Sequence, residues 1–219
     1  VMTAGREELL NDNEDNLSDV IFVATNFMGK LSDSRIIVND SPGVNFSGDD
    51  EHQKVANKLI KRRKYGLLIY VMNATQLGTN DESAHLDFVK QTIGRTPIMF
   101  VMNKVDSFNP DEENVVDVIQ RQKEYLLNKG FKNPMICPMS ARAGYLAKQY
   151  QQGELSRSEE RELYNYIDKF EKMKLYEYYR RDFPTIKIAD YEQEEEQLLK
   201  NCGLSYIESI INGYAKGGI

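Results

Sequence analysis

Short apolar runs alternate with longer polar stretches along the chain up to about residue 149. Runs of this length, bounded by Pro, Gly or polar residues, are typical of strands buried in a parallel sheet, and the stretches between them fit helical crossovers. The expected strands are residues 19–26, 34–39, 67–72, 97–102 and 135–137, and the expected helices are residues 50–64, 81–93 and 111–129. The pattern therefore predicts an α/β fold with a mostly parallel sheet flanked by helices.

The two ends of the chain differ from this core. The short loop around Gly29 separates the first two strands and predicts a β-hairpin at the N-terminal side. Residues 154–181 are polar and helix-like until Pro184, which indicates a helical insert near the C-terminus. The expected order is an N-terminal arm (1–18), the α/β core (19–149), the helical insert (150–200) and a C-terminal helix of the core (201–219).

Composition narrows the classes of function. The 219 residues are 41% hydrophobic and 28% charged with a net charge of −6, so no broad basic surface indicates binding to nucleic acid. No apolar stretch approaches the length of a membrane span, and the two cysteines fit reduced thiols in a cytoplasmic protein. The sequence begins with Val, from which we expect the natural protein to begin further upstream.

The apolar run 97–102 ends in the polar residues Asn103-Lys104-Val105-Asp106. Open parallel sheets bind ligands at the carboxyl ends of their strands, which is where these residues are expected. A carboxylate such as Asp106 can accept the two hydrogen bonds that guanine offers on N1–H and N2–H₂, whereas adenine has an acceptor at N1. The stem of Lys104 can lie along the flat face of a base. The segment therefore favours recognition of guanine.

A second polar segment, Asp40-Ser41-Pro42-Gly43, follows the strand expected at 34–39. The Pro fixes a turn, and Gly43 lets a backbone N–H approach a ligand closely. A carboxylate such as Asp40 at a strand end is suited to hold a magnesium ion through water. Taken alone, an ordinary strand-to-loop turn explains the same four residues better.

Three motifs at strand ends, D-x-P-G at Asp40, N-K-V-D at Asn103 and S-A at Ser140, together resemble the P-loop GTPases, in that family's order. Residues 39–47, 70–81 and 139–148 are more specifically similar to the bacterial dynamin-like GTPases. The likeness covers roughly residues 19–215, and the insert is its least specific part.

The resemblance implies binding of GTP or GDP with Mg²⁺. It implies that Asp40 approaches magnesium through water and that Gly43 donates its N–H to the γ-phosphate. It also implies that Asn103 supports the base, and that Ser140 and Ala141 form the base-supporting loop, with the Ala141 N–H facing the base oxygen. For the full-length protein it implies GTP hydrolysis coupled to self-association and to membrane remodelling, with peripheral membrane contact through regions outside this sequence.

One departure from the family pattern concerns the phosphates. The sequence has no G-x-x-x-x-G-K-[ST]. Gly29-Lys30 lacks the first Gly, and after Gly213 and Gly218 the residue Ile219 stands where the Lys should be. Thr3 is a bare candidate for the switch threonine. This loop supplies the amides and the Lys that hold the β- and γ-phosphates. We therefore expect an N-terminally incomplete GTPase domain that does not hydrolyse GTP at a useful rate. The alternative is a degenerate, non-enzymatic GTPase-fold module that binds a protein partner.

The same departure affects the sheet. In the family, the P-loop strand lies between the strands expected here at 34–39 and 67–72. Without it, these two strands either pair directly in parallel or accept a foreign strand between them, because buried backbone groups need partners.

Overall fold

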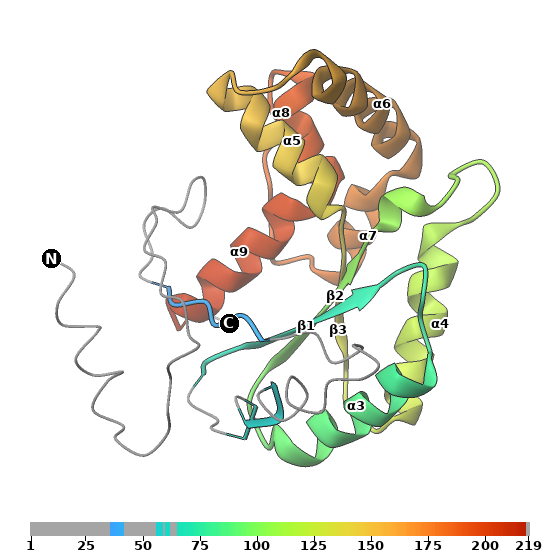
Figure 1. Ribbon diagram of the computed structural model, residues 1–219, viewed down its shortest axis with the longest axis vertical. Coiled ribbons are helices and arrows are strands. Elements are labelled where there is room, and N and C mark those ends of the chain that lie inside the picture. The colour runs from blue at the N-terminus through green and yellow to red at the C-terminus, as the bar shows by residue number, and fades with distance from the viewer. Residues whose placement is uncertain (1–35, 42–55, 59, 62–64, 218–219) are drawn as a thin grey trace, which may run out of the picture.

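Three parallel strands form the sheet of this α/β protein. The computed structural model of the chain describes residues 36–41, 56–58, 60, 61 and 65–217, and the fold is given for these residues (Figure 1). The strands are β1 (Leu68–Asn73), β2 (Ile98–Asn103) and β3 (Met135–Pro138), in the order β1-β2-β3. Val71 of β1 is the register partner of Val101 in β2, which is in turn opposite Cys137 in β3. All three strands thus end at the same edge of the sheet.

Helical crossovers connect the strands, as a parallel sheet requires. Helix α3 (Asn80–Thr92) joins β1 to β2, and α4 (Val115–Asn128) joins β2 to β3 after the 3₁₀ turn η2 (Val105–Ser107). Thr79 caps α3 by accepting a hydrogen bond from the Glu82 N–H, and Asn114 caps α4 through the Val116 N–H. These caps explain where each crossover helix begins.

Five helices of the described part follow β3. They are α5 (Ala141–Gln152), α6 (Arg157–Met173), α7 (Leu175–Asp182), α8 (Glu194–Asn201) and α9 (Leu204–Ala215). Figure 1 shows α5, α6 and α8 gathered beyond one end of the sheet, while α3 and α4 lie to one side of it and α9 to the other. The helical insert therefore lies beyond the edge where the strands end, because α5 begins directly after β3.

The sheet is covered unevenly. Strand β2 is buried on both faces, as its continuous apolar run predicts. In β1, Tyr70 and Met72 pack inward, whereas Val71 on the opposite face is 62% exposed. On that same face Val101 is only 4% exposed. The helices of the described part thus cover this face over β2 and leave it open over β1.

The strands predicted at 67–72, 97–102 and 135–137 are confirmed. The helix predicted at 111–129 begins later, at Val115, and the run 154–181 is divided at Lys174, which has a left-handed φ of 53°. Helix α5 follows the S-A motif and was not predicted as a helix. None of the helices in the described ranges combines the length and the apolar character needed to cross a bilayer.

The strand predicted at 34–39 is wrong for the residues that can be described. Residues 36–41 are not in a strand, and Ile37 and Val38 are 70% and 68% exposed. Local β-propensity does not suffice without a neighbouring strand to supply backbone partners. Within the described ranges β1 pairs only with β2, so neither predicted arrangement, direct pairing of 34–39 with β1 or a foreign strand between them, is found there. The arm 1–18, the strand 19–26 and most of the helix 50–64 lie outside the described residues.

Candidate functional site

Two loops lie side by side at the carboxyl ends of β2 and β3. We call residues 103–108 the β2 loop and residues 139–142 the β3 loop. The Asn103 side-chain oxygen Oδ1 accepts hydrogen bonds from the backbone N–H groups of Lys104 (2.8 Å) and Ala141 (2.9 Å). The Met139 N–H donates to the Met102 carbonyl at 2.8 Å, and the Val105 N–H donates to the Met139 carbonyl at 3.3 Å. The two loops are therefore held together as one unit.

The β2 loop turns sharply at Lys104. This exposed residue has a left-handed φ of 67°, which costs roughly 1 kcal/mol for a residue other than Gly. The Lys104 N–H bond to Asn103 Oδ1 and the 3.0 Å bond from the Ser107 N–H to the Lys104 carbonyl help to offset that cost. The turn leads directly into η2, which contains Asp106.

Asp106 is half-buried, and its carboxylate has no hydrogen-bond or ion-pair partner among the described residues. Its backbone carbonyl accepts a hydrogen bond from Lys169 Nζ of α6. Burial, together with the nearby charge of Asp106, raises the pKa of Tyr166 to about 12. Both carboxylate oxygens of Asp106 are thus available to accept hydrogen bonds from a ligand.

The β3 loop is fixed from its other side by the last helices. Buried Ser140 caps α5 by accepting a hydrogen bond from the Ala143 N–H at 3.1 Å, and its own N–H donates to the Cys202 carbonyl at 3.0 Å. The Tyr179 hydroxyl donates to the Pro138 carbonyl at 2.7 Å. Ser140 and Ala141 are therefore placed beside Asn103.

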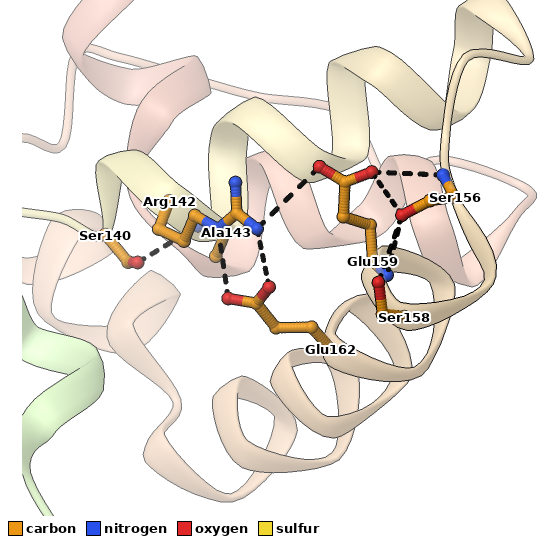
Figure 2. Close-up of polar contacts among 7 residues, drawn as sticks. All are labelled: Ser140, Arg142, Ala143, Ser156, Ser158, Glu159 and Glu162. Carbon is orange, nitrogen blue, oxygen red and sulfur yellow. Dashed lines mark hydrogen bonds and ion pairs between the residues drawn. The ribbon is translucent and has the colours of Figure 1, made fainter.

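Arg142 joins the β3 loop to the insert, as Figure 2 shows. Its guanidinium makes a bidentate ion pair with Glu162 of α6, at 3.0 Å from Nε and 2.6 Å from Nη2, and Glu159 lies 3.9 Å away. The hydrogen bond from Arg142 lowers the pKa of Glu162. Glu159 also forms a capping box with Ser156 at the start of α6. The start of α6 and the start of α5 are thus linked through charged groups.

No sequence pattern indicates that Lys169 and Arg142 are neighbours of this site. Arg142 follows the S-A motif, but Glu162 stands 20 residues further along the chain, and Lys169 is 63 residues from Asp106. Glu162 and Lys169 both belong to the polar run 154–181, in which many other charged residues have the same helical spacing. Only the packing of α6 against η2 identifies them.

Asp40 is not brought to this site by an adjoining strand. It is exposed, and the residues before it are not in the sheet. Gly43 lies outside the described residues. The described ranges contain no group of three or more His, Cys, Asp or Glu side chains that could hold a metal ion. No step through a metal ion therefore follows from the described residues.

A hollow of about 600 Å³ lies at the same edge of the sheet. It is lined by the loop after β1, including Thr75 and Gly78, and by Ser107, Glu113 and Gln122. At the end of β1, Asn73 Oδ1 accepts hydrogen bonds from the Thr75 N–H (3.2 Å) and from the Thr75 hydroxyl (2.9 Å). The ends of β1 and β2 thus border an open space beside the β2 loop.

Comparison of the chain with protein-family models, with curated proteins and with solved structures found no match. What the site can do is therefore argued from its own residues and geometry.

Proposed function

We propose that this protein binds guanine nucleotides through the β2 and β3 loops, as the base-reading part of a P-loop-type GTPase domain from a dynamin-like protein. The observation that carries the proposal is that Asn103 bridges the ends of β2 and β3, while in the same β2 loop the Asp106 carboxylate has no partner among the described residues. A half-buried carboxylate without a partner loses hydrogen bonds to water. A pair of donors on a ligand can replace them.

The chemistry of the β2 loop favours guanine over adenine. Asp106 would accept from N1–H and N2–H₂ of guanine, two charge-assisted hydrogen bonds. Adenine would place an acceptor against the carboxylate, which is unfavourable in a half-buried position. Lys104 is exposed and can lie along the face of the base. The Ala141 N–H already donates to Asn103, so a base oxygen would share this donor.

Binding of the nucleotide's phosphates depends on Asp40, Gly43 and Mg²⁺ in this proposal. It remains an expectation from the motifs. GTP hydrolysis, self-association and peripheral membrane contact belong to the full-length protein in this proposal. They are supported by the order of the motifs along the chain. No hydrolytic step follows from the described residues.

A non-enzymatic module is the second candidate. The observation that favours it is that residues 36–41 lie outside the sheet and residues 37–41 are exposed, which leaves Asp40 without a strand to position it. Such a module would keep the α/β fold for binding a protein partner. Guanine-selective binding by the chain separates the two candidates.

The base site is tested by the substitution Asp106→Asn. The exchange turns one acceptor into a donor, so the chain should lose affinity for GDP and gain affinity for xanthosine diphosphate. Loss of a charged hydrogen-bond pair corresponds to about 2–3 kcal/mol. Ligand-observed NMR titration of GDP, xanthosine diphosphate and ADP measures the three affinities. Equal binding of GDP and ADP by the unsubstituted chain, or unchanged GDP affinity in the variant, would remove Asp106 from a base site.

Phosphate release from GTP tests the expectation about hydrolysis. The chain should show no useful turnover, because its sequence lacks the loop that holds the β- and γ-phosphates. Turnover that is abolished by Asp40→Ala would contradict this expectation and would assign Asp40 to a working phosphate site.

A further inference from the structure

Helix α6 contacts both loops of the proposed base site. Near its C-terminal end, Lys169 reaches the β2 loop, and near its start, Glu162 binds Arg142 of the β3 loop. The helix begins at a capping box and packs against η2, α5 and α8. Its position relative to the two loops is thus set by several independent contacts.

The two links differ in strength. The Arg142–Glu162 pair is bidentate, but its side chains are 43% and 36% exposed, and exposed ion pairs contribute little because water and salt screen them. The Lys169 ammonium is half-buried and donates to a backbone carbonyl, which is a charge-assisted bond to a group that cannot rotate away. Lys169 is therefore the stronger link between α6 and the site.

The point at which Lys169 binds matters for recognition. It binds the backbone carbonyl of Asp106 and leaves the carboxylate without a partner among the described residues. An ammonium on the carboxylate would compete with a base for the same oxygens. On the carbonyl, it restrains the backbone of Asp106 while both carboxylate oxygens remain available. This is the contact expected of a residue that orients a recognition group without occupying its hydrogen-bonding atoms.

We propose that Lys169 is a positioning residue that holds Asp106 in the orientation that reads guanine, so that the helical insert sets the affinity and selectivity of the base site. This inference rests on the proposed function. A partner or a domain movement that displaces α6 would then weaken nucleotide binding without touching the nucleotide.

Three variants of the full chain test the inference. Lys169→Met keeps the length of the side chain and removes the donor, and Lys169→Arg keeps a charged donor. Lys172→Met is the matched control, because Lys172 lies on the same helix, is exposed and makes no hydrogen bond or ion pair with a described residue. Affinities are measured for GDP and for inosine diphosphate, which lacks the N2 amino group that Asp106 would bind.

Lys169→Met should weaken GDP binding roughly tenfold and lower the ratio of GDP to inosine diphosphate affinity. Lys169→Arg should restore both values in large part, and Lys172→Met should leave them unchanged. A general loss of folding would weaken the binding of GDP and of inosine diphosphate alike and leave the ratio of the two affinities constant. A constant ratio in Lys169→Met, or equal effects of Lys169→Met and Lys172→Met, overturns the inference.

Hydrogen exchange separates this inference from the proposed function. The amides of Val105 and Ser107 are hydrogen-bonded to the Met139 and Lys104 carbonyls, so their exchange reports the order of the β2 loop without any nucleotide. Lys169→Met should speed their exchange and Lys172→Met should not. If the unsubstituted chain binds GDP and ADP alike, the proposed function fails, and faster exchange still supports the positioning of the loop. Unchanged exchange in Lys169→Met overturns the positioning role whatever the chain binds.

Discussion

Asn103 and His85 are two polar side chains whose surroundings differ: Asn103 is half-buried and His85 is buried. One oxygen of Asn103 accepts two backbone N–H groups and joins two loops. His85 is only 8% exposed; its Nδ1 lies 3.2 Å from the Tyr70 hydroxyl, and its Nε2 has no hydrogen-bond partner in the described ranges. Burial lowers the pKa of His85, because the charged ring would lose its hydration.

The lowered pKa of His85 predicts a loss of stability in mild acid. The unfolded chain takes up a proton near pH 6.5, and the folded chain does so only at lower pH, so the free energy of unfolding falls as the pH drops below about 6.5. The slope is at most about 1.4 kcal/mol per pH unit for one group. Urea unfolding between pH 8 and pH 5.5 should show this fall, and His85→Gln should flatten it.

The titration of Glu82, three residues before His85, changes the free energy of unfolding with pH in the opposite direction. Burial raises the pKa of its carboxyl, so its contribution to stability is lost as the pH rises through the folded-state value. Glu82 is present in both proteins, and the difference between the original and His85→Gln therefore isolates the histidine. Parallel pH profiles would show that His85 takes up its proton equally in the folded and unfolded chain.

At the scale of elements, the junction of α8 and α9 is pressed against the end of β3. Gly203, between the two helices, has a φ of 90°, and a Cβ atom there would lie 2.3 Å from the Pro138 carbonyl oxygen and 3.1 Å from the Tyr179 hydroxyl. Tyr179 stacks on Tyr206 with ring centroids 4.2 Å apart. The close approach lets the Cys202 carbonyl accept the Ser140 N–H, so this junction positions the β3 loop.

Gly203→Ala should therefore destabilise the protein by more than the conformational cost alone. Gly153→Ala is the control, because Gly153 has a similar φ of 71° but a Cβ there would meet nothing within 4 Å. The control should cost roughly 1 kcal/mol for the left-handed conformation. Gly203→Ala should cost about 1–3 kcal/mol more, because the backbone must shift away from Pro138. Equal losses in urea unfolding would show that the junction can move freely.

At the scale of the whole molecule, one face of the sheet is covered over β2 and β3 and exposed over β1. The face that carries Val71, Val101 and Cys137 is buried over β2 and β3, while Val71 remains 62% exposed. Within the described ranges the outer edge of β1 has no neighbouring strand. The hydrophobic core therefore lies between β2, β3 and the helices that follow them, and β1 contributes only one face to it.

A pair of Val→Thr substitutions tests this uneven cover. Val71 and Val101 are register partners on one face, so they lie at the same level of the sheet. Val71→Thr should change the free energy of unfolding by less than about 0.5 kcal/mol, since a hydroxyl there stays in water. Val101→Thr should cost about 1–3 kcal/mol, because its hydroxyl would be buried without a partner. A comparable loss at Val71 would mean that another part of the chain or a second molecule covers that face.

The sequence by itself determined the strands of the sheet and the order of polar residues at their ends. Continuous apolar runs such as 97–102 leave few alternatives to a strand buried on both faces. Because parallel strands end at one edge, Asn103 and Ala141 could be expected to lie close together although 38 residues separate them. The C-terminal helix expected within residues 201–219 is likewise present as α9, which begins after Gly203.

Tertiary structure alone decided the rest. Residues 36–39 have the β-propensity of a strand but are not in one, because a strand exists only where a neighbour supplies hydrogen-bond partners. Nothing in the spacing of Lys169 relates it to Asp106, and nothing in the polar run 154–181 selects Glu162 as the partner of Arg142. Local patterns report which face of an element is apolar, whereas the contacts between distant polar residues depend on how the helices pack, and that packing is set by the whole core at once.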